Sequence, residues 1–331
     1  MPLKCDAVFE GGGVKGIGLA GAVSAIQNAG YEFQNMAGTS AGAIIASLLA
    51  VGFTGDEIGK LLKTIEYQKF RDETAMDHFG LPGKTLNIAI EYGIYKGDYF
   101  ESWLENLLRS KGKTTFGDIK INNPSQEKYK YKFCAIASDI TDKKLLILPE
   151  SLKDFGIDPD QFSISRAVRM SMSIPLFYEP IKLIDSTGRT HYIVDGGVLS
   201  NYPIWLLDDG TSTPEWPTFG FKLTEFNNHE LPTEDFKPID SLTTFLESLI
   251  GTMMSGNDKY HISKSLGDFS RTINISTTVN IKNTQTKIYT TDFDITQEES
   301  QALFNNGVIS AQEFLKEWNF ETWKQRYRQN R

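Results

Sequence analysis

The N-terminal segment contains two successive strand–turn–helix units, and this order constrains the fold more strongly than any other feature of the chain. A strand at 5–9 is followed by a glycine-rich loop at 10–16 and by a helix from about 17 to 29. A second strand at 33–37 then leads into an apolar helix at 41–51. Two strands joined through a helix normally run parallel. We therefore predict an α/β fold with a mainly parallel central sheet flanked by helices.

The rest of the sequence predicts a single domain over 1–331. A core at about 5–224 is interrupted by a helical insertion at about 54–110, in which we expect no strand, and helices and strands follow at about 225–331. We find no internal repeat and no low-complexity segment. Further strands are predicted at 131–138, 144–148, 192–194 and 219–223, and extended segments at 271–275 and 286–290. Helices are predicted at 163–173, from about 241 and at 296–318. Loops are predicted at 80–83, 93–98 and 227–238.

The charge balance restricts the partners of the chain. Aspartate and glutamate (42) outnumber lysine and arginine (34), which gives a formal net charge of -8. Nucleic-acid-binding proteins usually carry a basic excess, so we expect no nucleic-acid partner.

The longest apolar stretch, 41–53, is shorter than the roughly 20 residues of a membrane-spanning helix, and we see no apolar leader. We expect a cytoplasmic protein with peripheral contact at the inner membrane surface, and buried thiols at Cys5 and Cys134.

The pentapeptide Gly38-Thr39-Ser40-Ala41-Gly42 connects the second strand to its helix. A G-x-S-x-G sequence at this position is typical of a nucleophile elbow, where small residues permit a sharp turn that projects the serine hydroxyl. Gly38 and Gly42 would be the elbow glycines and Ser40 the nucleophile. A purely structural turn uses the same residue types, so the pentapeptide alone leaves both interpretations open.

Gly11, Gly12 and Gly13 end the first strand and open the next helix. Such uncovered amides stabilise negative charge, either of a phosphate or of the oxyanion in acyl transfer. A dinucleotide site would need an acid at the end of the second strand, whereas Glu32 precedes that strand. A phosphate-binding loop would need serine or threonine after Lys15, where the chain has glycine. The serine elbow one unit later favours the oxyanion, because neighbouring parallel strands end at the same edge.

A serine nucleophile needs a base, and the histidines offer no motif; they are His78, His191, His229 and His261. Asp195 follows an apolar strand and precedes two glycines, a pattern that fits either a catalytic acid or an Asp-Gly turn. His191 is four residues from Asp195, or about 13 Å along a strand at about 3.3 Å per residue, so we do not expect a triad. Our hypothesis is a serine–carboxylate pair that forms an acyl-enzyme and then activates water.

Together, the glycine loop, the serine elbow and Asp195-Gly196-Gly197 resemble the patatin-like phospholipase family, as does the segment 165–177. The resemblance covers about residues 5–224 well. It implies a patatin-like three-layer fold in which Ser40 is the nucleophile and Asp195 the base. The amides of Gly12 and Gly13, beside Gly11, would form the oxyanion hole. It also implies that no cofactor and no metal are needed. Lys15 stands where many members have arginine; it keeps the charge that orders the loop but not the planar fork.

The resemblance implies hydrolysis of fatty acyl esters in membrane glycerophospholipids, with the insertion at about 54–110 controlling access. The insertion is rich in apolar and aromatic side chains, which belong either to a lipid-facing surface or to its own core: Phe79, Leu81, Ile88, Ile90, Tyr92, Ile94, Tyr95, Tyr99, Phe100 and Trp103. Two alternatives remain open, a soluble carboxylesterase for small acyl esters and a non-enzymatic module that binds an anion. A homo-oligomer is compatible with the sequence.

Overall fold

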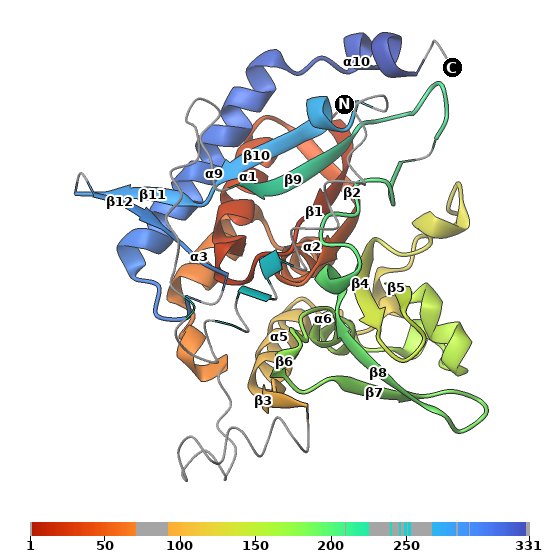
Figure 1. Cartoon of the computed structure of the whole chain (residues 1–331). Helices are drawn as coiled ribbons and strands as arrows, with labels where there is room; N and C mark the ends of the chain where they lie inside the picture. Colours follow the sequence, from red (N-terminus) through yellow and green to blue (C-terminus); the bar gives the residue numbers. More distant parts are fainter. Residues whose placement is uncertain are drawn as a thin grey trace.

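Figure 1 presents the computed structural model of the chain. The structure describes residues 2–70, 92–208, 210–224 and 267–328 except 283 and 291, and it also describes isolated residues between 239 and 252. Within these residues, an eight-stranded sheet forms the centre of the molecule and helices pack against it. The predicted α/β class, with a mainly parallel central sheet flanked by helices, is confirmed.

The described strands are β1 (Leu3–Phe9), β2 (Tyr31–Thr39), β3 (Gly93–Tyr95), β4 (Phe133–Asp139), β5 (Lys144–Leu148), β6 (Leu176–Tyr178), β7 (Ile181–Ile184), β8 (Thr190–Asp195), β9 (Thr218–Thr224), β10 (Thr272–Ser276), β11 (Thr278–Ile281) and β12 (Thr284–Lys287). The α-helices are α1 (Gly16–Asn28), α2 (Ala41–Val51), α3 (Gly55–Thr64), α5 (Asp98–Ser110), α6 (Ile164–Ser171), α9 (Gln297–Glu317) and α10 (Phe320–Tyr327). Short 3-10 helices include η1 (Gly13–Lys15), η2 (Tyr67–Phe70) and η8 (Gly196–Val198).

The central sheet has a parallel part and an antiparallel part. Its order is β10-β9-β1-β2-β4-β8-β7, and β5 pairs with β4 outside this order. All neighbours from β10 to β4 are parallel, as the N-terminal strand–turn–helix units predict. In contrast, β8 is antiparallel to both β4 and β7, and β5 is antiparallel to β4. The glycine loop and the serine elbow therefore follow parallel strands, whereas Asp195 ends an antiparallel one.

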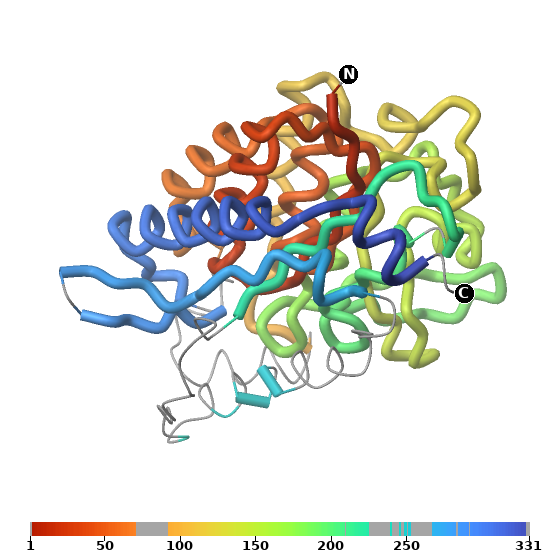
Figure 2. The backbone as a smooth tube through the Cα atoms, turned by 90° about the horizontal axis from the view of Figure 1, so that it is seen from above, coloured from red at the N-terminus to blue at the C-terminus, as the bar shows by residue number. Residues whose placement is uncertain are grey.

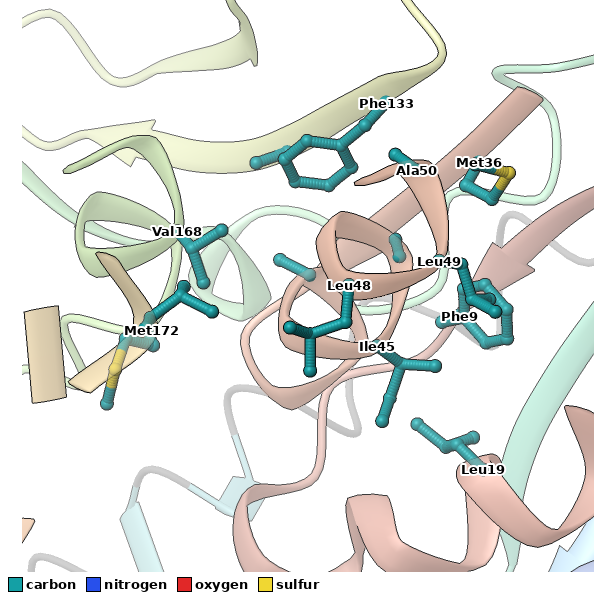
Figure 3. Close-up of a cluster of buried hydrophobic side chains, with 14 of the residues drawn as sticks. Phe9, Leu19, Met36, Ile45, Leu48, Leu49, Ala50, Phe133, Val168 and Met172 are labelled. Carbon is teal, nitrogen blue, oxygen red and sulfur yellow. The ribbon is translucent and has the colours of Figure 1, made fainter. Parts of the chain in front are cut away.

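Helix α2 lies inside the main apolar core, because nearly every position of its sequence is apolar. All of its residues except Ile44 are buried. Figure 3 shows side chains of this helix, among them Ile45, Leu48 and Leu49, surrounded by residues of β1, α1, β2, β4 and α6. A helix that is packed on all sides cannot shift without disturbing close-packed neighbours. The residue at its N-terminus, Ser40, is therefore held on a rigid support.

The two faces of the sheet are covered by different segments. Along β1, Ala7 and Phe9 belong to the main core on the side of the helices. Val8 points to the opposite face, as the alternation of side chains along a strand requires. There it packs with Ala37, Ile136 and the segment 202–207. This second apolar cluster fixes the chain that follows Asp195 against the sheet.

Helix α9 packs along α1, although the two are far apart in the sequence (Figure 2). The small residues of α1 make this close approach possible: a Cβ atom on Gly21 would lie 2.0 Å from the carbonyl oxygen of Phe304. On the other helix, a Cβ atom on Gly307 would lie 1.9 Å from the carbonyl oxygen of Gly18. The small residues of α1 thus serve a close contact between two helices. Helix α9 begins with a capping box at Thr296.

The insertion contains a short strand that the sequence analysis did not predict. β3 pairs in parallel with β6, with Gly93 opposite Leu176 and Tyr95 opposite Tyr178. The prediction of an insertion without strands and of a loop at 93–98 is therefore wrong. A three-residue strand has no local pattern of its own, and it depends here on a partner far along the chain.

Most described aromatic side chains of the insertion belong to the main apolar core of the molecule. Phe100 and Tyr95 are buried, and Trp103 and Ile94 pack against the core, whereas Tyr92 and Tyr99 are 51% and 41% exposed. The following predictions lie outside the described residues: the side chains Phe79, Leu81, Ile88 and Ile90, the loops at 80–83 and 227–238, almost all of the helix from about 241, and His78, His229 and His261.

Cys5 and Cys134 are free and buried, as predicted. Among the described helices, none has the length and hydropathy required to cross a bilayer.

Candidate active site

Ser40 and Asp195 are brought together because β2 and β8 meet on one edge of β4. Residues 135–139 of β4 pair with β5, which occupies one edge of the strand. The other edge is shared: Thr39 of β2 lies opposite Ile136, and Asp195 of β8 lies opposite Ala137. Since β2 and β8 run in opposite directions, their carboxyl ends meet head-on at consecutive positions of β4. A strand has only two hydrogen-bonding edges, so this arrangement forces the two chains to turn away from each other.

Ser40 makes the sharp turn on the β2 side. Its backbone has φ 53° and ψ -123°, a strained conformation for a residue other than glycine, and its side chain is buried. The flanking glycines are required by close backbone contacts. A Cβ atom on Gly38 would lie 2.3 Å from the carbonyl group of Gly42, and one on Gly42 would lie 2.4 Å from the carbonyl oxygen of Phe9. The backbone geometry is that of a nucleophile elbow.

Asp195 makes the corresponding turn at the end of β8. Its Oδ1 accepts a hydrogen bond of 2.7 Å from the Gly197 amide and so caps η8, which means that the Asp-Gly turn and the candidate base coincide. A Cβ atom on Gly196 would lie 2.3 Å from the carbonyl oxygen of Ile136, so this position needs glycine. The other carboxylate oxygen, Oδ2, is buried and has no hydrogen bond of ordinary geometry among the described residues. It is the oxygen that remains free to accept a proton.

The environment of Asp195 changes its acidity strongly. Burial raises the pKa of the carboxyl from its ordinary value near 3.8 to about 7. The Gly197 amide and the side chain of Ser40 act in the opposite direction and lower the pKa by stabilising the charged form. A carboxylate with a pKa near neutrality is a far better base than an exposed aspartate.

The glycine loop is anchored at both ends by residues that the sequence analysis did not identify. The Gly11 amide donates to the carbonyl oxygen of Asn201 at 3.1 Å, and the Val14 amide donates to that of Thr290 at 3.2 Å. The Gly11 amide therefore already has a backbone acceptor, whereas its predicted part in an oxyanion hole stays a prediction. Asn201 follows the Asp-Gly-Gly motif closely, but Thr290 lies in the C-terminal third, where no motif indicated a role.

Between these anchors lie the amides of Gly12 and Gly13, for which no hydrogen-bond acceptor is found among the described residues. Gly13 has φ +56°, and a Cβ atom there would lie 2.0 Å from the carbonyl oxygen of Thr290, so the loop requires glycine. The aliphatic part of Lys15 covers the loop, because its Cε would lie 3.6 Å from a Cβ atom on Gly12. That Lys15 orders this loop stays a prediction.

His191 is held apart from the pair by three acidic residues. Its Nδ1 lies 2.7 Å from Asp139 and 3.8 Å from Asp142, and its Nε2 lies 3.3 Å from Asp185. Hydrogen bonding to Asp139 is the main reason that its pKa is raised. Asp139, Asp142 and His191 are also the side chains that could hold a metal ion among the described residues. Their atoms already pair with one another, and Asp142 with Arg189 at 2.8 Å.

A small apolar cavity of about 20 Å³ begins beside the glycine loop and the elbow. Its walls are apolar side chains of α1, α2, α3, η2 and α5, together with the backbone of the loop: Gly13, Gly16, Ile17, Ala41, Ile44, Ile45, Leu62, Ile65, Tyr67, Phe70 and Trp103. A more open hollow of about 740 Å³ lies between α3, α9 and β11, and it contains none of the predicted site residues.

Residues 7–208 match the model of a protein family described as patatin-like phospholipase. The chain is 39% identical over 321 residues to YqhO of Bacillus subtilis, an uncharacterized protein, and the match covers 95% of this chain and 99% of that one. It is also 26% identical over 197 residues to the protein named "Probable lipid hydrolase 463L" of invertebrate iridescent virus 6, with 60% of this chain and 61% of that one covered.

Solved structures with the same fold include VipD of Legionella pneumophila, with a TM-score of 0.54 and 18% identity. The type III effector ExoU has a TM-score of 0.52 and 15% identity. Each match covers 95% of this chain, but it covers 67% of the VipD chain and 53% of the ExoU chain. At these identities the likeness concerns the fold.

Proposed function

The chain belongs to the patatin-like phospholipase family, and we propose that it is a lipid acyl hydrolase with Ser40 as nucleophile and Asp195 as base. One observation carries this proposal: the ends of β2 and β8 lie opposite consecutive residues of β4, so a strained serine adjoins a buried carboxylate. The family membership favours lipid esters as the class of substrate.

The proposed reaction begins when Ser40 Oγ attacks the ester carbonyl carbon and Asp195 accepts the hydroxyl proton. The carbonyl oxygen becomes an oxyanion, which the amides of Gly12 and Gly13 would stabilise by hydrogen bonds. The carbon–oxygen bond to the alcohol then breaks, and Asp195 returns the proton to the leaving oxygen. Water then attacks the acyl carbon while Asp195 accepts a proton from the water. The bond between the acyl carbon and Ser40 Oγ breaks, Asp195 returns the proton to Ser40 Oγ, and the fatty acid is released.

The pKa of about 7 supports a direct role for the carboxylate, because Asp195 would bind and release protons near neutral pH without a histidine. The contacts of His191 with Asp139 and Asp185 support the same reading, since both ring nitrogens already have acidic partners.

An acyl substrate is compatible with the apolar side chains that line the cavity next to Gly13 and Ala41, but its volume of about 20 Å³ holds only about one water-sized group, so the acyl class rests on the family membership. The name of the iridescent virus relative, a lipid hydrolase, agrees with this class. Within it we propose acyl esters of membrane glycerophospholipids, reached by peripheral contact of the protein with the membrane.

The test compares hydrolysis of phosphatidylcholine and phosphatidylglycerol vesicles with that of a short soluble ester, for wild type, Ser40→Ala and Asp195→Asn. We expect both variants to lose at least about 10³-fold in kcat, with circular dichroism spectra like the wild type. Full activity in either variant would overturn the dyad. A preference for the soluble ester without any gain on vesicles would indicate a carboxylesterase, and binding of an anion without turnover would indicate a binding module.

A further inference from the structure

We propose that Ser171 is a positioning residue for the nucleophile, whose hydroxyl holds the Ser40 amide and thereby keeps the elbow in its strained conformation. This inference rests on the proposed function of Ser40. Ser171 is the last residue of α6 and is fully buried. It lies in the segment 165–177 that resembles the family, where the sequence pattern indicates no role for it.

The Ser171 hydroxyl joins two backbone groups at the junction of β2 and β8. Its Oγ accepts a hydrogen bond of 2.9 Å from the Ser40 amide and donates one of 2.6 Å to the carbonyl oxygen of Ile136. Ile136 is the residue of β4 opposite Thr39, just before the position where β8 takes over the edge. One hydroxyl therefore connects the nucleophile to the strand on which the two halves of the site meet.

The Ser40 amide needs this partner because of the turn that Ser40 makes. Ser40 is the N-cap of α2, and its own side chain forms no capping hydrogen bond. The positive φ is unfavourable for serine, so the turn persists only where the surroundings enforce it. Without an acceptor for its amide, the buried residue could relieve the strain by a small rotation that would move Oγ away from Asp195.

The same end of α6 also holds the candidate base. The Asp195 amide donates to the carbonyl oxygen of Ser173 at 2.8 Å, two residues after Ser171. The end of α6 is in turn tied to the insertion and to the chain after β6, because the buried Arg169 donates to the carbonyl oxygens of Lys96 and Glu179. The segment 171–173 thus holds both members of the pair through their backbones.

The contacts of Ser171 exclude a direct chemical role. Its hydroxyl proton is given to Ile136 and its oxygen accepts the Ser40 amide, so the group does not relay protons from Ser40 Oγ. The effect of losing it should appear in the rate of attack by Ser40 and not in substrate binding. A displacement of about 1 Å at a reacting atom costs about 100-fold in rate.

Ser171→Ala tests this role, and Ser165→Ala is a matched control on the same helix. Ser165 is also buried, and its hydroxyl donates to Glu105 at 2.9 Å, away from Ser40. The readouts are KM and kcat for a soluble ester, together with the melting temperature. The concentration of active sites used for kcat is titrated with a fluorophosphonate. We expect Ser171→Ala to lower kcat about 10- to 100-fold with KM changed less than about 2-fold, whereas Ser165→Ala keeps the wild-type kcat per site.

Ser171→Cys is the second variant if Ser171→Ala does not fold, because it fills the place of the hydroxyl with a slightly larger thiol that forms weaker hydrogen bonds. It should lower kcat per site in the same way, by a smaller factor. A wild-type kcat per titrated site in the folded Ser171 variant would overturn the positioning role while Ser40→Ala remains inactive. Equal hydrolysis by wild type and Ser40→Ala would instead overturn the proposed function, and the positioning role with it.

Discussion

At the scale of single residues, the site places a carboxylate where its charge is costly. Asp195 is buried, and its charged form keeps the Gly197 amide and the nearby Ser40 side chain as partners. The pKa of Asp195 is raised for the same reason, because an environment that disfavours the charge makes the carboxylate more basic. Basicity at Asp195 is thus obtained at the expense of stability.

The pH dependence of the reaction should follow Asp195. The proposed base must be deprotonated to accept the Ser40 proton, so kcat/KM should rise with pH and reach half its maximum near pH 7. The measurement is kcat/KM for a neutral soluble ester between pH 4.5 and 9. A profile that is flat over this range, or one that is half-maximal near pH 4, would contradict a carboxyl of raised pKa as the base.

Asp195→Asn should stabilise the protein at high pH while it removes activity. The folded-state pKa is raised, so the contribution of the protonated carboxyl is complete below about pH 3.8 and is lost as the pH rises through about 7. Asparagine keeps an oxygen for the Gly197 amide but carries no charge. We expect its free energy of unfolding in urea to exceed that of wild type by roughly 2–4 kcal/mol at pH 8.5, with a much smaller difference at pH 4.5. Equal stabilities at pH 8.5 would argue against this account.

His191 should matter for stability and not for turnover. Its pKa is raised, mainly through Asp139, so its contribution is complete below the unfolded value of about 6.5 and is lost as the pH rises through the folded value. His191→Gln should therefore destabilise the fold more at pH 5.5 than at pH 9, as urea denaturation would reveal. Its kcat should remain within about 3-fold of wild type, whereas loss of turnover in a folded variant would indicate a histidine triad.

At the scale of elements, the contact between α1 and α9 depends on glycine in both helices. In an exposed helix, Gly307→Ala would stabilise by up to about 1 kcal/mol. Here the added Cβ would lie 1.9 Å from the Gly18 carbonyl oxygen, which is backbone and cannot rotate away. We expect a net loss of about 1–3 kcal/mol in the free energy of unfolding.

Glu313→Ala, at an exposed position of the same helix, is the control for this change and should alter stability by less than about 0.5 kcal/mol. If Gly307→Ala is as stable as wild type, the two helices do not pack as closely as described.

The elements that the sequence predicted well are those with a strong local pattern. The apolar helix at 41–51 and the glycine-interrupted turn before it depend on near neighbours, and they occur as predicted. The missing strand β3 and the antiparallel course of β8 depend on partners far along the chain. Composition and periodicity carry no information on such pairings.

The same distinction applies to the candidate site. Ser40, Asp195 and the glycine loop were identified because each follows a strand and carries an unusual turn sequence. Their arrangement on one edge of β4 could not be predicted without the register. Asn201 and Thr290 act through their backbone carbonyl oxygens, and Ser171 acts through two hydrogen bonds of its hydroxyl to backbone groups. Contacts of this kind leave no pattern in the sequence.

At the scale of the whole molecule, the C-terminal third completes the site that the N-terminal part begins. Strand β10 extends the sheet beside β9, α9 covers α1, and Thr290 anchors the end of the glycine loop. Residues from 11 to 290 therefore contribute to one small region. The amides of Gly12 and Gly13, the elbow and the carboxylate are held by contacts that only the complete fold provides.

The central claim is that Ser40 is a nucleophile activated by Asp195, and covalent labelling tests it most directly. The folded chain is treated with a fluorophosphonate at pH 8, and the modified peptide is identified by mass spectrometry. We predict one adduct, on Ser40, with no labelling of Ser40→Ala and labelling of Asp195→Asn slowed at least about 100-fold. An adduct on another residue, or a wild-type labelling rate in Asp195→Asn, would contradict the claim.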